Sequence, residues 1–158
     1  MKTLVIGLGN PILGDDGVGW RIAEHVRSQI DPNLPVDVDY LSLGGISLME
    51  HLIGYERAIL IDAVISDKEP GSILVSKLGD IPDYSAFHIT SAHDTSLQNA
   101  MKLGRDMGAQ LPEDVTVIGI AAKHIYDFSE ELSPSVAEAI PKVTQIVVDL
   151  LKQNIIIQ

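Results

Sequence analysis

The opening of the chain constrains the fold more than any other stretch. An apolar run over residues 3–8 leads into a turn with several glycines, and a helical pattern begins near Asp16. An uninterrupted apolar run is typical of a strand that is covered on both faces, as in a parallel sheet. The order strand, glycine-rich turn, helix therefore predicts the first unit of an α/β domain.

The rest of the chain repeats this alternation of apolar runs and helical patterns. Further strands are expected at residues 36–40, 58–65, 73–75 and 115–121, and further helices at 46–53, 93–108 and from 133 onward. Residues 73–75 follow 58–65 so closely that we expect a hairpin between them, which makes a mostly parallel sheet mixed. The pattern predicts a three-layer α/β/α sandwich, with residues 1–158 forming one domain.

Charge and composition exclude several classes of partner and chemistry. The chain has 11 Lys+Arg and 22 Asp+Glu, a net charge of −11, which disfavours nucleic acids and anionic membranes as partners. It contains no cysteine, so disulfides, zinc knuckles and a cysteine nucleophile are excluded. No apolar run is long enough to cross a membrane or to resemble a signal peptide, so we expect a cytoplasmic protein.

Three candidate positions are expected at one edge of this sheet, because ligand sites in open α/β sheets form beyond the carboxyl ends of the strands. Asp15 and Asp16 follow the first strand, Asp62 lies late in the run 58–65, and His93 begins the predicted helix 93–108. Two carboxylates and one imidazole would leave coordination positions open on a metal ion, and imidazole suits nickel, zinc or iron.

Each position also has a purely structural interpretation. One of the carboxylates at residues 15–16 would suit the N-cap of the following helix, and residue type does not decide which one. Asp62 interrupts an apolar strand, so it needs either a buried structural partner or a functional one. His93 is either a hydrogen-bonded core residue or a ligand whose neutral form is favoured by the positive end of the helix.

Residues 7–10, Gly-Leu-Gly-Asn, followed by residues 14–19, Gly-Asp-Asp-Gly-Val-Gly, resemble the signature of the hydrogenase maturation proteases. These endopeptidases trim the C-terminus of the large subunit of nickel–iron hydrogenases. The resemblance extends over the whole chain and includes the glycine pair at residues 44–45 and the segments around Asp62 and His93. It implies a mixed five-stranded sheet, the large-subunit precursor as partner, and nickel that is supplied by the substrate.

The resemblance also implies roles for particular residues. Asp16, Asp62 and His93 would contact the metal and carry the catalysis. Asp15 would cap the helix and orient its neighbour, and the residues assigned to substrate binding are Asn10, Asp15, Gly44 and Gly45.

Three alternative functions share some of these sequence features. Peptidyl-tRNA hydrolases share the Gly-Leu-Gly-Asn-Pro opening, but Ile12 stands where they have glycine, and the acidic charge suits tRNA poorly. A dinucleotide site needs Gly-x-Gly-x-x-Gly, and Ile12 occupies its last position. A non-catalytic nickel-binding maturation chaperone would bind nickel tightly on its own, whereas the protease is expected to bind it weakly without the precursor.

Overall fold

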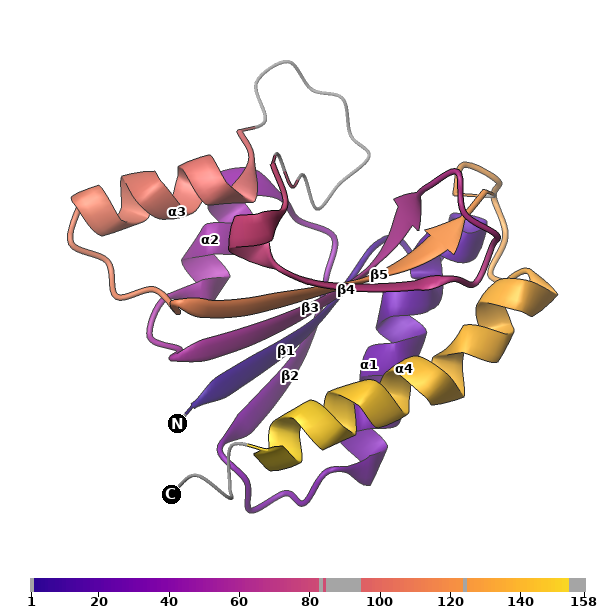
Figure 1. The fold of residues 1–158 in the computed structure, drawn as a ribbon, viewed down its shortest axis with the longest axis horizontal. Coiled ribbons are helices and arrows are strands. Elements are labelled where there is room, and N and C mark those ends of the chain that lie inside the picture. The colour runs from indigo at the N-terminus through magenta and orange to yellow at the C-terminus, as the bar shows by residue number, and fades with distance from the viewer. Residues whose placement is uncertain (1, 83, 85–94, 124, 154–158) are drawn as a thin grey trace.

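The computed structural model describes residues 2–82, 84, 95–123 and 125–153. Its centre is a five-stranded sheet with the order β2-β1-β3-β5-β4 (Figure 1). The strands are β1 (Thr3–Leu8), β2 (Val36–Leu41), β3 (Arg57–Ile65), β4 (Ile73–Lys77) and β5 (Asp114–Ala122). The first four in the sheet order are parallel, and β4 is antiparallel to β5.

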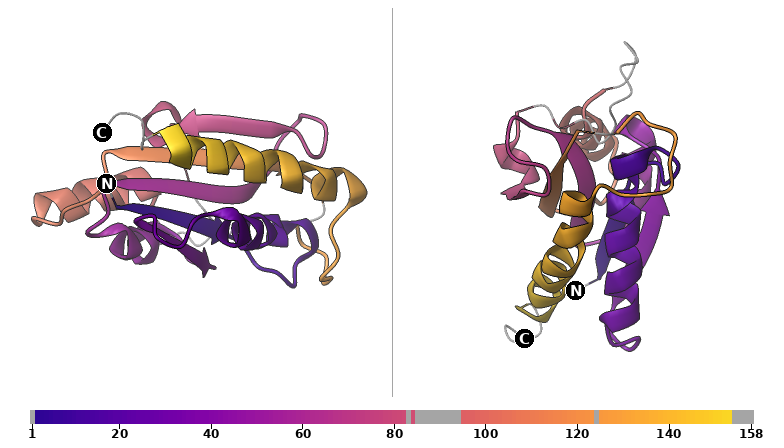
Figure 2. Two further views of the ribbon diagram at one scale, coloured as in Figure 1. Left: turned by 90° about the horizontal axis from the view of Figure 1, so that it is seen from below. Right: turned by 90° about the vertical axis from the view of Figure 1, so that its right-hand side faces the viewer.

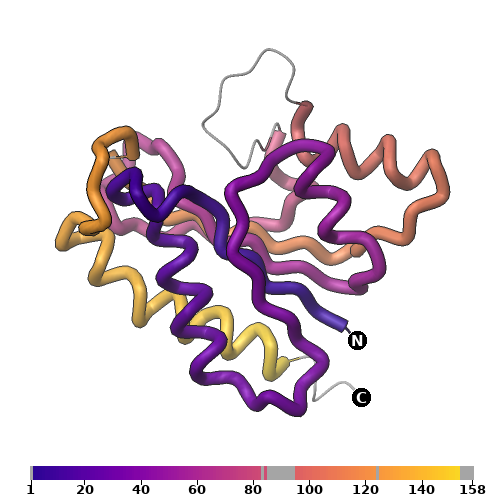
Figure 3. The backbone as a smooth tube through the Cα atoms, turned by 180° about the vertical axis from the view of Figure 1, so that it is seen from behind, coloured from indigo at the N-terminus to yellow at the C-terminus, as the bar shows by residue number. Residues whose placement is uncertain are grey.

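Helices cover both faces of the sheet, as the predicted three-layer α/β/α sandwich requires. Helices α1 (Val18–Gln29) and α4 (Pro134–Gln153) pack on one face, and α2 (Gly45–Leu52) and α3 (Leu97–Asp106) pack on the other (Figure 2). Seen from behind, α1 lies against α4 (Figure 3). Each face has its own largely aliphatic core, so β1, β3 and β5 are buried on both sides.

The predicted hairpin between residues 58–65 and 73–75 is wrong. Strand β5 lies between β3 and β4, with Arg57 opposite Asp114 in one ladder and Ile73 opposite Ile120 in the other. The two long apolar strands pair with each other because both must be covered on both faces and along both edges. The shorter and partly exposed β4 is left for the edge of the sheet.

The helix predicted to begin at His93 begins at Leu97 instead. Ser96 is its N-cap, and its side chain accepts a hydrogen bond of 3.2 Å from the Asn99 N–H. Residues 79–91 show no period and were expected to form a loop, but a short 3₁₀ helix (Leu78–Asp80) occupies its beginning. Among the described residues, no helix is both long and apolar enough to cross a membrane.

Two glycines allow β1, β3 and α1 to approach each other at backbone distance. A Cβ on Gly19 would lie 2.4 Å from the Ile61 carbonyl oxygen, and one on Gly7 would lie 2.4 Å from the Gly19 carbonyl oxygen. No larger residue fits at either position without moving a strand. This close approach brings the 3₁₀ helix η1 (Gly14–Gly17) into contact with β3.

Candidate functional site

The candidate site lies where the chain leaves β1 and β3 toward opposite faces of the sheet. Helix α1 follows β1 on one face, whereas the chain after β3 continues through β4 to α3 on the other (Figure 1). Such a divergence between neighbouring parallel strands is where open α/β sheets bind ligands. Asp16 lies in η1 directly after β1, and Asp62 lies in β3 opposite Gly119 of β5.

Asp62 is buried with only part of its hydrogen-bonding capacity used. The residue is 1% exposed, and its Oδ2 accepts a hydrogen bond of 3.1 Å from the Tyr84 hydroxyl. Its Oδ1 has no hydrogen-bond partner among the described residues. Burial, and then the nearby charge of Asp16, raise the pKa of Asp62 well above its usual value, and hydrogen bonds from the Tyr84 hydroxyl and the Ala63 backbone offset only part of this.

No ion pair with Asp62 is found in the described part of the chain. Arg57, at the other end of the same strand, instead places its Nε 3.5 Å from Asp114 Oδ2. Within the described residues, Asp62 therefore has no salt bridge of the kind that its structural interpretation would supply. A carboxylate buried without a cation is costly, and the support for Asp62 among the described residues is the Tyr84 hydroxyl and the backbone N–H of Ala63.

Asp16 is held by the turn that precedes it. The residue is 4% exposed, and its Oδ2 accepts a hydrogen bond of 2.9 Å from the Asn10 N–H. Gly9 has φ +135°, and a Cβ there would lie 1.9 Å from the Asp16 carbonyl oxygen, so only glycine lets the turn wrap so closely. The side chain of Asn10 also belongs to this turn, because its Oδ1 accepts from the Ile12 N–H at 3.2 Å.

Asp15 makes its hydrogen bonds to a different part of the chain from Asp16. The residue is 1% exposed, and its two carboxylate oxygens accept hydrogen bonds of 2.7 Å from the N–H and the hydroxyl of Ser133, 118 residues further along the chain. Ser133 immediately precedes α4. The expected cap on α1 is wrong, since the N-cap of α1 is Gly17 and carries no side-chain hydrogen bond. Asp15 instead joins η1 to the start of α4.

The glycine pair at residues 44–45 lies at the same edge of the sheet. Gly44 is the N-cap of α2, and Gly45 has φ +52° with its Cα facing the Thr95 carbonyl oxygen, 3.1 Å from where a Cβ would be. The Ser42 hydroxyl donates a hydrogen bond of 2.5 Å to the Gly9 carbonyl oxygen, which ties the end of β2 to the Asn10 turn. The predicted substrate-binding residues Asn10, Gly44 and Gly45 thus follow neighbouring strands.

His93, the third predicted ligand, lies outside the described residues, so its place in the set stays a prediction. Within the described ranges, no group of three His, Cys, Asp or Glu side chains is arranged to hold a metal ion. The described part of the site consists of two interacting buried carboxylates, Asp16 and Asp62. Carboxylate oxygens, one of them without a hydrogen bond, suit a cation brought from outside.

Tyr84 was not identified from the sequence. It is 6% exposed, and its backbone is fixed by two hydrogen bonds to α3: its N–H donates to Gln98 Oε1 at 3.1 Å, and its carbonyl accepts from the Leu97 N–H at 3.0 Å. Burial and the Asp62 carboxylate raise the pKa of Tyr84 well above its usual value, so it remains a hydrogen-bond donor at neutral pH. A single tyrosine in a segment without periodicity carries no signal that would have revealed this contact.

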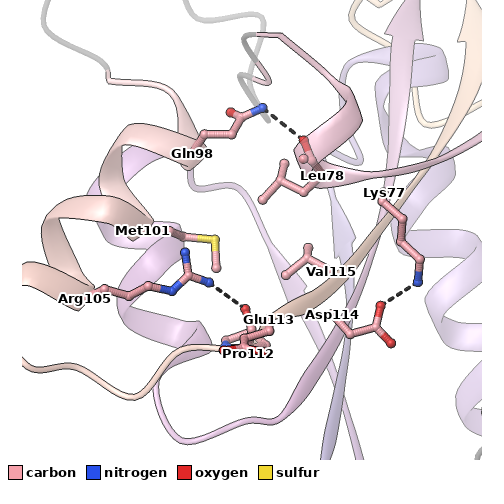
Figure 4. Close-up of a pocket in the computed structure, with 10 residues that line it drawn as sticks. Lys77, Leu78, Gln98, Met101, Arg105, Pro112, Glu113, Asp114 and Val115 are labelled. Carbon is pink, nitrogen blue, oxygen red and sulfur yellow. Dashed lines mark hydrogen bonds and ion pairs between the residues drawn. The ribbon is translucent and has the colours of Figure 1, made fainter.

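A pocket of about 580 Å³ lies at the opposite edge of the sheet, between α3 and the start of β5 (Figure 4). Three of its charged side chains contact neighbouring protein atoms: Lys77 Nζ lies 2.5 Å from Asp114 Oδ1, and Arg105 donates a hydrogen bond of 2.9 Å to the Pro112 carbonyl. None of the predicted site residues lines this pocket. Its size alone gives no reason to place the chemistry there.

Comparison with known proteins identifies the family. The model of the hydrogenase maturation protease family matches residues 20–150. The hydrogenase expression/formation protein HupD of Rhodobacter capsulatus is 30% identical over 138 residues, which cover 86% of this chain and 64% of that protein.

Solved structures show the same architecture. The hydrogenase maturating endopeptidase HybD from Escherichia coli has a TM-score of 0.77 at 24% identity, covering 98% of this chain and 94% of that one. A hydrogenase 2 maturation peptidase from a Thaumarchaeota archaeon has a TM-score of 0.69 at 28% identity, covering 96% and 98%. Together with the family match, these similarities show that the chain belongs to the hydrogenase maturation proteases, a family of hydrolases that act on peptide bonds.

Proposed function

We propose that this protein is an endopeptidase that removes a C-terminal peptide from the large-subunit precursor of a nickel–iron hydrogenase once the precursor carries nickel. Family membership supports the peptidase activity and the maturation role. The observation that carries the proposal is the state of Asp62, a buried carboxylate beside Asp16 with one oxygen that accepts no hydrogen bond from any described residue. Such an arrangement is incomplete without a cation.

The nickel of the substrate would supply that cation. Asp16, Asp62 and His93 are the proposed contacts, and Asn10, Asp15, Gly44 and Gly45 line or support the edge where the precursor binds. Two adjacent buried carboxylates repel each other, so a divalent ion brought by the substrate gains binding free energy that a nickel-free precursor does not. The enzyme would thereby distinguish loaded from unloaded precursor by a difference in affinity, and immature subunits would remain uncut.

Peptide hydrolysis at this site needs a polarised carbonyl and a base. The metal ion of the substrate can polarise the scissile carbonyl or a water molecule. One carboxylate of the pair takes a proton from the attacking water, whose oxygen bonds to the carbonyl carbon, and that proton passes to the nitrogen as the C–N bond breaks. Asp16 or Asp62 would serve as this base, since both carboxylates lie at the edge of the sheet where the precursor is proposed to bind.

The test is to incubate the protein with nickel-loaded and nickel-free forms of the same precursor and to follow the subunit by intact mass spectrometry. We expect shortening of the loaded form only. Absence of shortening with the loaded form, together with tight nickel binding by the isolated protein in titration calorimetry, would favour the non-catalytic chaperone. Equal shortening of both forms would leave a peptidase but remove nickel from its recognition.

A further inference from the structure

We infer that Ile12, Tyr126 and Phe128 form a docking surface for the large-subunit precursor, and that it binds an apolar segment flanked by basic residues. We call these three side chains the apolar patch. The inference rests on the proposed function, because it takes the precursor as the partner. It adds a place of contact outside the carboxylate site and a chemical character for the segment that binds there.

The segment after β5 is anchored firmly at both ends. Ile125 is 2% exposed and packs in the core beneath α1 and α4, and Leu132 packs partly against the same cluster. At the far end, Ser133 is held by both oxygens of Asp15. Tyr126 and Phe128 therefore lie on a segment that is held in place on both sides.

Backbone hydrogen bonds bring Ile12 alongside this segment. The Ser129 N–H donates to the Ile12 carbonyl at 2.9 Å, and the Gly14 N–H donates to the Ser129 carbonyl at 2.8 Å. Leu13 and Ser129 form a parallel β-bridge at the same point. The loops that follow β1 and β5 are thus joined into one surface, although β3 separates their strands in the sheet.

The apolar patch leaves large side chains in contact with water. Ile12 is 48% exposed, Tyr126 is 64% exposed and Phe128 is 87% exposed. The chain has only two phenylalanines, and its core is built from aliphatic residues, so an almost fully exposed phenylalanine is not explained by folding. Neighbouring exposed apolar residues of this kind mark interaction sites, and aromatic side chains contribute strongly to binding at them.

The charges around the apolar patch indicate what covers it. Asp127, Glu130 and Glu131 are exposed on the same segment, and they outnumber the two nearby cations, Lys123 and Arg21, whose Nη2 donates a hydrogen bond of 3.0 Å to the Glu130 carbonyl. The whole chain carries a net charge of −11. A partner with basic residues beside an apolar segment complements this surface. A second copy of this chain does not, because a two-fold contact through the patch would set these acidic residues against their own copies.

The position of the apolar patch connects recognition to the candidate chemistry. Ile12 and Asp16 belong to the same turn, and the Asn10 N–H that holds Asp16 is two residues from Ile12. Asp15 in that turn fixes the segment that carries the two aromatic residues. A precursor segment bound on the patch therefore lies next to the turn that presents Asp16 toward Asp62.

The test compares the double variant Tyr126→Ser/Phe128→Ser with Met107→Ser as a matched control. Met107 is 79% exposed and lies at the C-terminal end of α3, on the far side of the sheet from the patch (Figure 1). We expect the double variant to raise the KM for nickel-loaded precursor about 10- to 30-fold with little change in kcat. Met107→Ser should leave both within about two-fold, and thermal unfolding should stay the same in all three proteins.

Direct binding to the loaded precursor, measured by biolayer interferometry at two salt concentrations, separates this inference from the proposed function. If the wild type binds without cutting, and the double variant alone loses binding, the docking surface stands and the peptidase proposal fails. If the wild type cuts and the double variant matches the Met107 control, the docking surface is overturned. Binding that does not weaken at higher salt would contradict the prediction that basic residues flank the precursor segment. Dimers that form with rising protein concentration and are lost in the double variant would show that the patch binds a second copy of this chain.

Discussion

Asp15 and Asp62 are buried to the same degree but differ in how fully their carboxylates are hydrogen-bonded. Each residue is 1% exposed. Both oxygens of Asp15 accept short hydrogen bonds from Ser133, at the junction of η1 with α4. Asp62, late in β3, is supported by the Tyr84 hydroxyl and the Ala63 backbone, has one oxygen without a partner among the described residues, and faces the charge of Asp16.

The difference separates a structural carboxylate from a chemical one. Folded proteins satisfy nearly all buried polar groups, and exceptions occur where function requires them. Asp15 follows this rule and joins two distant parts of the chain. Asp62 departs from it, and the free energy that the fold loses there is recovered only when a cation or a proton arrives. Substitutions at the two positions should therefore have opposite effects on stability and on activity.

The largest effect is expected on catalysis by Asp62→Asn. The substitution keeps the size of the side chain but removes its charge and its ability to act as a base, so processing of nickel-loaded precursor should fall about 10²- to 10⁴-fold. Asp67→Asn, the same change at an exposed position in the turn after β3, should process at the wild-type rate. Wild-type processing by Asp62→Asn would remove Asp62 from the site.

The next effect is a loss of stability in Asp15→Asn. An amide in place of the carboxylate cannot accept both hydrogen bonds from Ser133, and we expect the free energy of unfolding to fall by about 1–3 kcal/mol in urea titrations. A double-mutant cycle with Ser133→Ala should show coupling between the two residues. Additive effects of the two substitutions would mean that the contact between η1 and α4 contributes little.

A gain of similar or smaller size is expected in the stability of Asp62→Asn at neutral pH. A carboxyl whose pKa is raised by folding holds its proton more tightly in the folded chain, so the folded state loses stability as the pH rises from the ordinary value of 3.8 through the raised one. The amide escapes this loss, and we expect a gain of about 1–2 kcal/mol at pH 7. The gain should vanish as the pH falls toward 3.8. A destabilised variant at pH 7 would contradict the account.

The smallest effect is expected in Tyr84→Phe. Loss of one hydrogen bond to Asp62 should slow processing about 3- to 10-fold, which corresponds to about 0.6–1.4 kcal/mol. Because that hydrogen bond lowers the pKa of Asp62, its removal should move the acidic limb of the pH–rate profile to higher pH. An unchanged pH profile with an equally slower rate would mean that Tyr84 acts only by packing.

The layers of the fold could be predicted because periodicity reports burial. The apolar runs at β3 and β5 and the helical spacing of α1 indicated a sheet covered on both faces, and the structure confirms it. The hairpin prediction failed because it relied on closeness in sequence, whereas strand pairing followed the burial of β5. Periodicity shows that a strand is buried, but it does not show whether β4 or β5 will pair with β3.

The site was predicted only in part, because sequence shows which residues follow each strand but not which distant residues contact them. The topology of an open sheet brings residues after β1 and late in β3 to one edge, which is why Asp16 and Asp62 could be paired from sequence. Contacts across long stretches of chain could not be read in this way. Asp15 was expected to cap the next helix but holds Ser133 instead, and Tyr84 reaches Asp62 from a segment without periodicity. His93 stays a prediction.

The comparison between the two carboxylates is tested most directly by measuring processing rate and unfolding free energy on the same samples of Asp15→Asn and Asp62→Asn. With nickel-loaded precursor, we predict that Asp62→Asn is folded, at least as stable as the wild type at pH 7, and inactive. Asp15→Asn should be less stable yet still cut the precursor at temperatures where it remains folded. A stable but inactive Asp15→Asn beside an active Asp62→Asn would reverse the two roles and contradict the account.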